Sequence, residues 1–136
     1  RNALKRAFPS EEFDLRLGSL EHLPLPDNSL DLALALCSLH HLHAPQNALQ
    51  EVARVLKPGG FFIWVDLNPH EDKKLLQEHG DIWPGFEPDL CRFWLSQADL
   101  CTCEHQVRPG TPPFSLFLLR GQKAPSGAAP ALSRKP

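Results

Sequence analysis

The sequence predicts an α/β fold in which a parallel strand–helix–strand unit is followed by an antiparallel hairpin. Residues 30–36 and 61–65 are almost wholly apolar, as in strands buried on both faces of a parallel sheet. The segment between them ends at Pro58-Gly59-Gly60, which stops a helix and reverses the chain. Residues 101–107 and 114–119 favour strands, and the Pro-rich turn that separates them indicates a hairpin.

A short strand, a buried strand and a helix are predicted before the second apolar strand. Residues 13–17 alternate between apolar and polar types, which predicts a short strand with one buried face. Residues 30–36 form the next strand, and Pro45 is suited to the first turn of the helix that follows. That helix has an apolar stripe at Leu49, Val52, Ala53 and Leu56.

The elements after that strand are shorter. Residues 69–79 predict a short polar helix, 82–86 an irregular aromatic stretch, and 88–100 a further helix. From Gly121 the composition is Ala, Pro, Ser, Gly and Lys, with almost nothing to bury. We therefore expect one domain over residues 1–120 and a disordered tail over 121–136.

Composition excludes several classes of protein. The 136 residues are 42% hydrophobic and 22% charged with a net charge of −2, so we expect one globular domain without a nucleic-acid footprint. No apolar run approaches the ~18 residues of a membrane span. The four cysteines form no CxxC pair, which favours reduced thiols and a cytoplasmic protein. Because the chain begins at Arg1 and contains no Met, we expect it to be a piece of a longer protein.

Three segments together carry a resemblance to a known family: residues 23–31 (LPLPDNSLD), 39–42 (LHHL) and 49–60 (LQEVARVLKPGG). Over residues 13–119 the chain resembles the class I S-adenosylmethionine-dependent methyltransferases, and most closely the ubiquinone/menaquinone type. Asp66, Pro69-His70 and residues 78–80 resemble a branch in which the methyltransferase follows an arsenical-resistance-type helix-turn-helix regulator.

The resemblance implies S-adenosylmethionine as cofactor and a Rossmann-like methyltransferase half-sheet. It is a half-sheet because the family's glycine-rich loop after its first strand, and the acidic residue after its second, do not occur in this sequence. Residues 1–120 would then be a partial class I methyltransferase domain, the C-terminal portion only.

Four cofactor-binding residues follow from the resemblance. Ser19 stands where the family usually has an acidic residue facing the adenine, and Leu20 would offer its backbone N–H and an apolar wall. Cys37 and Ser38 begin the loop that passes beside the sulfonium and the substrate. The alternative for residues 18–21 is a plain exit from a strand into a loop.

The catalytic candidates are His40, His41 and Asp66. A histidine could act as a base if the acceptor must lose a proton, because its pKa lies near neutrality. Alternatively, one histidine packs and hydrogen-bonds the loop while the other is solvated. Asp66 could hold a substrate amine or hydroxyl, or it could cap the next helix.

No metal site is expected from the spacing. The two candidate clusters are His40, His41 and His43, and Cys101, Cys103 and His105. Neither has a zinc-ligand spacing such as CxxC.

Two further groups of residues have structural interpretations. Glu51 and Arg54 are expected to form a solvated i, i+3 pair. Trp64, Trp83 and Trp94 are expected to pack in the core and beneath a lid.

The predicted function is methyl transfer from S-adenosylmethionine to a small-molecule acceptor, as the C-terminal part of a longer enzyme. We expect no contact with nucleic acid or membrane, and the oligomeric state stays open. The alternative is a non-catalytic interaction or regulatory remnant without the glycine loop. A dehydrogenase-like nucleotide binder is disfavoured because no GxGxxG occurs. Residues 1–136 alone should bind S-adenosylhomocysteine weakly or not at all.

Overall fold

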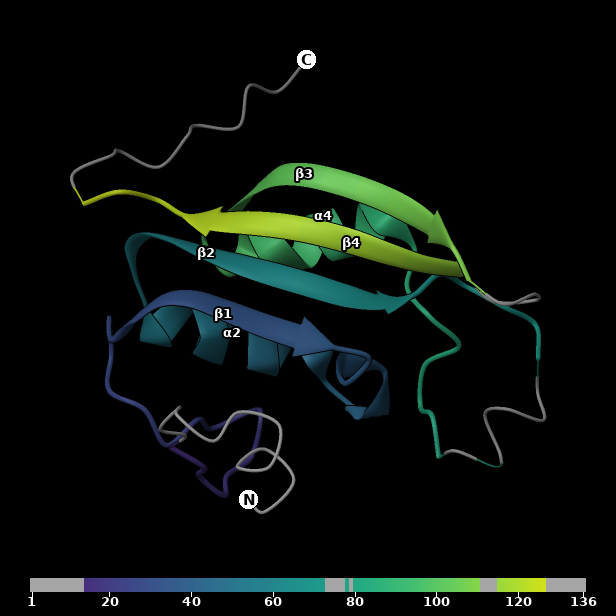
Figure 1. The fold of residues 1–136 in the computed structure, drawn as a ribbon, viewed down its shortest axis with the longest axis horizontal. Helices are drawn as coiled ribbons and strands as arrows, with labels where there is room; N and C mark the ends of the chain where they lie inside the picture. Colours follow the sequence, from purple (N-terminus) through teal and green to yellow (C-terminus); the bar gives the residue numbers. More distant parts are fainter. Residues whose placement is uncertain (1–13, 73–77, 79, 111–114, 127–136) are drawn as a thin grey trace, which may run out of the picture.

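A mixed sheet with helices on one face is the framework of the molecule (Figure 1). The computed structural model describes residues 14–72, 78, 80–110 and 115–126. Within this described part the elements are β1 (Leu30–Leu36), the 3-10 turn η1 (Leu39–His41), α2 (Pro45–Val55), β2 (Leu56–Leu67), α4 (Pro88–Gln97), β3 (Leu100–Pro109) and β4 (Ser115–Lys123). The strands lie in the order β1-β2-β4-β3.

The strand–helix–strand unit is confirmed. β1 pairs with β2 in parallel from Leu32 opposite Phe61 to Leu36 opposite Val65, and α2 provides the crossover. β2 begins at Leu56, five residues before the predicted strand, and its pairing with β1 is irregular in this first part. Because the two strands are parallel, both end at the same edge of the sheet. There the backbone N–H of Cys37 donates to the carbonyl of Val65 at 2.8 Å. The residues that follow the two strands are therefore neighbours.

The C-terminal hairpin is also confirmed, with β4 inserted between β2 and β3. Both strands are longer than predicted, and β4 includes residues 121–123, which the composition of the chain places in the tail. The correction has a packing reason: a Cβ at Gly121 would lie 3.5 Å from the Cβ of Leu100, so the backbone here lies against the core. Lys123 adds a bond from Nζ to the carbonyl of Leu56 at 2.8 Å. The rest of the expected tail, from residue 127, lies outside the described residues.

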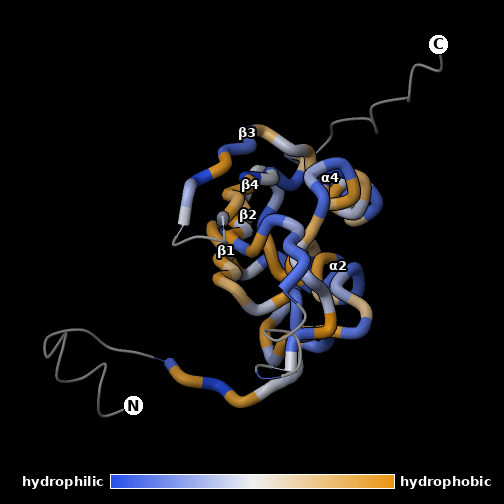
Figure 2. Tube along the Cα trace, turned by 90° about the vertical axis from the view of Figure 1, so that its right-hand side faces the viewer, coloured by the Kyte–Doolittle hydropathy of each residue, from blue (hydrophilic) through white to orange (hydrophobic). Residues whose placement is uncertain are grey.

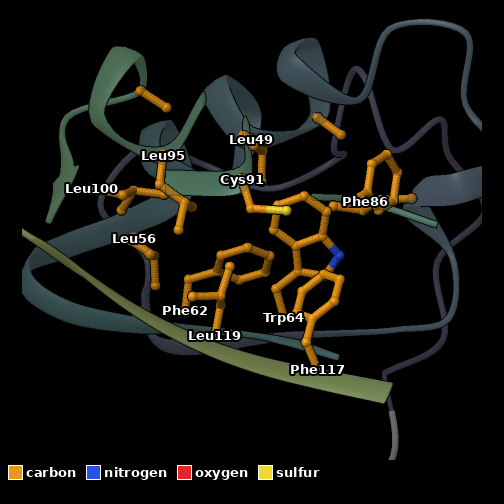
Figure 3. Close-up of a cluster of buried hydrophobic side chains, with 13 residues drawn as sticks. Leu49, Leu56, Phe62, Trp64, Phe86, Cys91, Leu95, Leu100, Phe117 and Leu119 are labelled. Atoms are coloured by element: carbon orange, nitrogen blue, oxygen red, sulfur yellow. The ribbon is translucent and has the colours of Figure 1, made fainter. Parts of the chain in front are cut away.

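The core lies between the sheet and the two helices (Figure 3). Trp64 is fully buried and makes edge-to-face contacts with Phe86 and Phe117, at centroid distances of 5.2 and 5.4 Å. Aromatic pairs of this geometry stabilise a fold by about 0.5–1.5 kcal/mol each beyond the burial of their area. Leu49 from α2 and Leu95 from α4 close the core on the helix side.

The opposite face of β1 is open, contrary to the expectation of burial on both faces. Figure 2 shows both helices on one side of the sheet. Alternation directs Leu32, Leu34 and Leu36 to the other side, where their exposed fractions are 54–57%. Within the described part of the chain, no element therefore covers the leucines on this face of β1.

Three smaller predictions need correction. Residues 14–17 form no strand, because the alternation there finds no hydrogen-bonded partner strand and Arg16 bonds instead to Asp14 and the carbonyl of Pro24; Phe13 lies outside the described residues. Of the helix expected over 69–79, residues 69–72 are not helical and Glu78 is, whereas 73–77 and 79 also lie outside the described residues. α4 ends at Gln97, three residues early, where Asp99 adopts a left-handed φ of +57° that turns the chain into β3.

Candidate functional site

The loop that leaves β1 separates two adjacent histidines. Cys37 has a φ of +42°, and the residues after it form η1, closed by a bond from the N–H of Leu42 to the carbonyl of Leu39 at 3.1 Å. Successive side chains of a 3-10 turn diverge by about a third of a turn. His40 consequently points inward with a side chain only 6% exposed, whereas the side chain of His41 is 45% exposed. The structure thus has the arrangement in which one histidine is packed and the other is accessible.

Asp66, near the end of β2, contacts the buried histidine, His40. Its Oδ1 lies 2.5 Å from Nδ1 of His40 and accepts the backbone N–H of Leu67 at 2.9 Å. Its Oδ2 accepts the indole N–H of Trp64 at 3.2 Å. The carboxylate is fully buried, and such burial is tolerated only when the oxygens are hydrogen-bonded in this way. With Nδ1 engaged, Nε2 is the nitrogen of His40 that remains for a ligand.

The structure gives Asp66 hydrogen bonds that neither sequence-based interpretation included. Its oxygens accept hydrogen bonds from Trp64, Leu67 and His40, and residues 67–72, which follow it directly, form no helix that it could cap. Asp66 therefore fixes the orientation of the neighbouring imidazole of His40.

A second loop brings Asp81 to the histidines. The backbone N–H groups of Ile82 and Trp83 both donate to the carbonyl of His40 at 3.0 Å. The indole N–H of Trp83 donates to the carbonyl of Leu42 at 2.9 Å, which ties the same two loops together a second time. The side chain of Asp81 is only 3% exposed as a result, with Oδ1 3.4 Å from Nε2 of His40 and 3.2 Å from Nδ1 of His41.

Gly85 permits the close approach of this loop to the end of β2. Its φ is +93°, and a Cβ there would lie 2.3 Å from the carbonyl oxygen of Asn68. The following residue, Phe86, donates its N–H to the carbonyl of Leu67 at 2.9 Å. Sequence reasoning assigned residues 82–86 to an irregular aromatic stretch and missed Asp81, because neither periodicity nor spacing along the chain relates it to residues 40 and 41.

The thiols near this site are poorly suited to nucleophilic chemistry. Partial burial, and after it the negative charge of Asp66, raises the pKa of Cys37. Burial and the same carboxylate raise the pKa of Cys91 to about 12. The thiolate is the reactive form of cysteine, so a raised pKa disfavours nucleophilic chemistry at both residues.

The predicted cofactor-binding residues lie on two loops. Ser19 and Leu20 belong to a small turn in which the N–H of Glu21 donates to Oγ of Ser19 at 3.2 Å, and the Leu20 side chain is exposed. Glu21 also accepts a 3.4 Å bond from the amide of Asn47, in the first turn of α2. That turn of α2 follows the loop of Cys37 and Ser38, so both loops lie toward the same end of the sheet.

A cleft of about 680 Å³ extends along the N-terminal segment. It is lined by residues from 14 to 30, including Gly18 and Leu20, and reaches Leu30 at the beginning of β1. Ligands of open α/β sheets bind outside the carboxyl ends of the strands. From Leu20 the cleft extends to Leu30, at the opposite end of β1, so the histidine cluster, and not this cleft, is the better candidate for a reaction site.

Glu51 and Arg54 fix the segment between the two loops, and their description as a solvated pair needs correction. Glu51 accepts the N–H of Leu23 at 2.8 Å, while Arg54 donates to the carbonyls of Leu23 and Leu25 and to Asp27. Hydrogen bonding from Arg54 is the main reason that the pKa of Glu51 falls to about 2. The pair thereby fastens residues 23–27 along α2.

Comparison with known proteins points to one class. Residues 1–64 match the family described as "Methyltransferase domain". Over 55 residues the chain is 42% identical to a fatty-acid O-methyltransferase from Mycolicibacterium smegmatis, an alignment covering 40% of this chain and 20% of that protein. Across three of the curated relatives that it matches, the chain spans 13–25% of their length.

Solved structures define the fold. The trans-methyltransferase CalH, solved in complex with SAH, aligns with a TM-score of 0.73 and 18% identity over 90% of this chain and 39% of its own. The [4+2]-cyclase SpnF aligns equally well, with a TM-score of 0.73 and 18% identity over 91% of this chain and 60% of its own. The chain has the Rossmann-like methyltransferase fold. Because a cyclase shares this fold, the reaction must be argued from the site.

Proposed function

We propose that this chain forms the acceptor side of an S-adenosylmethionine-dependent methyltransferase that acts on a small molecule, as the C-terminal part of a longer enzyme. The observation that carries the proposal is the buried contact between Asp66 and His40. It lies where two parallel strands end, in a chain whose residues 1–64 match a methyltransferase family. Histidine at this position can orient an acceptor and manage its proton.

The roles within the cluster follow from exposure. His41 is the accessible member, so it would contact the acceptor and receive its proton. His40 and Asp66 are buried, and their role is positioning: Asp66 fixes the ring of His40, and the carbonyl of His40 fixes the loop that carries Asp81. These contacts hold the reacting groups in place, and such positioning accounts for much of the rate enhancement in transfer reactions.

The described residues are compatible with one side of the cofactor. Leu20 presents an exposed apolar surface beside the hydroxyl of Ser19, a combination suited to an adenine ring. Cys37 and Ser38 begin the neighbouring loop, and η1 uses no side-chain bond from Ser38, which leaves this hydroxyl for a ligand. Bound S-adenosylmethionine would supply an electrophilic methyl group on a positively charged sulfur.

The test uses the full natural protein that contains residues 1–136. We expect saturable S-adenosylhomocysteine binding in calorimetry, and transfer of labelled methyl from S-adenosylmethionine to a member of a panel of hydroxyl, carboxylate, amine and thiol acceptors. His41→Ala should reduce transfer without weakening S-adenosylhomocysteine binding. His43→Ala, a change at an exposed histidine two residues away, is the matched control and should retain transfer.

Two results would contradict the proposal. Absence of S-adenosylhomocysteine binding by the full protein would favour a non-catalytic interaction protein, a function for which the exposed Leu32, Leu34 and Leu36 also argue. Low-micromolar binding by residues 1–136 alone would instead contradict the part of the proposal that requires a longer enzyme.

A further inference from the structure

The side chains of His40, His41 and Asp81, from two loops, bring possible metal-ligand atoms close together. Nε2 of His40 lies 3.4 Å from Oδ1 of Asp81, and Nδ1 of His41 lies 3.2 Å from the same oxygen. One ligand atom from each residue lies within 4.8 Å of the other two. We propose that a divalent transition-metal ion of the zinc class binds between them, a site that spacing along the chain did not predict.

The distances agree with tetrahedral coordination. Zinc binds imidazole nitrogen and carboxylate oxygen at about 2.0–2.1 Å, and two ligands of a tetrahedron with such bonds lie about 3.3–3.4 Å apart. The two nitrogen–oxygen separations here are 3.4 and 3.2 Å. Both separations from the carboxylate oxygen therefore fit a tetrahedral site, and one ligand atom of each of the three residues lies within 4.8 Å of the other two.

Asp81 supplies independent evidence that a ligand is needed. Only 3% of its side-chain surface is exposed. Its Oδ1 accepts no hydrogen bond from any residue in the described part of the chain. The two imidazole nitrogens are near this oxygen, but neither meets the geometry of a hydrogen bond to it. A buried carboxylate oxygen that accepts no hydrogen bond is costly, and a cation would satisfy it.

The surroundings of the histidines also resemble a metal site. Ligating histidines commonly donate their second ring nitrogen to a carboxylate, which fixes the ring and raises its basicity. Asp66 has this relationship to Nδ1 of His40, at 2.5 Å. Two carboxylates, Asp66 and Asp81, and two neutral imidazoles would balance the charge of one divalent ion.

The position suggests what the ion would do. Three protein ligands leave a fourth coordination position open, as in catalytic zinc sites. This cluster lies where β1 and β2 end, so an oxygen or sulfur of the acceptor could occupy that position and become more acidic there. The ion would then take over the acceptor contact that the metal-free cluster leaves to His41. Binding of the ion itself does not depend on the proposed methyl transfer.

The test is metal binding by the full chain after treatment with a chelator. We expect one Zn²⁺ per chain in calorimetry, and a visible spectrum of tetrahedral Co²⁺ without sulfur ligation. Asp81→Asn and His41→Ala should each weaken Zn²⁺ binding strongly. Asp66→Asn should weaken it by about 10–100-fold at unchanged stoichiometry, as for other partners of ligating histidines.

Two control variants separate this site from other ligands. His43→Ala should bind Zn²⁺ as the parent does, because His43 lies outside the cluster. The Cys101→Ser/Cys103→Ser double variant should also retain binding, although both thiols are exposed. His41→Ala alters a half-exposed side chain and should fold even if Asp81→Asn does not.

Either of two results would overturn the inference. One is no 1:1 binding at Zn²⁺ concentrations up to ~1 mM, which corresponds to less than about 4 kcal/mol of binding free energy. The other is unchanged affinity in a folded His41→Ala or Asp81→Asn variant. Preference for Fe²⁺ over Zn²⁺ would support the site and change the metal, because two histidines and one carboxylate also serve non-haem iron.

Discussion

The carboxylate of Asp66 lies 2.5 Å from Nδ1 of His40. This contact joins the ends of two parallel strands whose first paired residues, Leu30 and Leu56, are 26 positions apart in the sequence and are linked by a crossover helix. Both Asp66 oxygens accept hydrogen bonds, from His40, Leu67 and Trp64. The pair thus couples the core beneath the sheet's edge to the loop that carries the histidines.

Asp66→Asn should lower the free energy of unfolding by about 1–3 kcal/mol, because the new amide places a donor against an existing donor. Urea unfolding measures the loss. In a His40→Phe background one of the three donors is absent, so the same change should cost less, with a coupling energy of about 0.5–3 kcal/mol. Equal costs in the two backgrounds would show that the Asp66–His40 contact contributes nothing to stability.

Gly85→Ala should destabilise the protein more than Gly59→Ala. Both glycines have a positive φ, +93° and +81°, so both substitutions carry a backbone strain of about 1–3 kcal/mol. Only at Gly85 would the new Cβ also overlap the carbonyl of Asn68, whereas the space around Gly59 is open. Thermal unfolding of the two variants checks the order, and an equal loss at both sites would refute the close approach of this loop to β2.

Trp83→Phe should loosen the loop that holds Asp81. The change removes the indole N–H that donates to the carbonyl of Leu42 and preserves an aromatic ring beside Trp94. We expect a loss of about 1 kcal/mol in the free energy of unfolding and faster amide exchange at Ile82 and Phe86. Unchanged exchange at these amides would mean that the bond does not hold the loop.

Acid should weaken the attachment of residues 23–27 to α2. The pKa of Glu51 is lowered from 4.5 to about 2 in the folded chain, so its contribution to stability is complete above pH 4.5. The contribution is lost as the pH falls from 4.5 toward 2, because the unfolded chain takes up the proton first. The melting temperature should therefore fall more steeply in this range for the parent than for Glu51→Gln. Parallel curves would contradict the assigned role of Glu51.

The sequence predicts the framework of this fold well, since that framework depends on local patterns. The residues of β1 were predicted to the residue, and those of the hairpin within a few positions, from apolar runs and turn chemistry. Strand formation at 14–17 failed because alternation requires a partner strand that the described chain does not provide. Burial of both faces of β1 failed because it depends on what covers a sheet, which a single strand's composition does not determine.

The site was predictable only in part. His40, His41 and Asp66 follow from their places after apolar strands and from the family resemblance. Asp81 lies 40 residues from His41, and its approach depends on Gly85 and on two backbone bonds to the carbonyl of His40. Such contacts arise from loop packing and leave no periodic pattern in the chain.

The central claim is that a methyltransferase-type cofactor site lies at the ends of β1 and β2. Titration of the full natural protein with S-adenosylhomocysteine, followed by amide NMR shifts, tests it most directly. The account predicts saturable shifts at Ser19, Leu20 and residues 37–41, with Gly59 and β3 unaffected. Saturable shifts confined to other parts of the chain, or none at all, would contradict it.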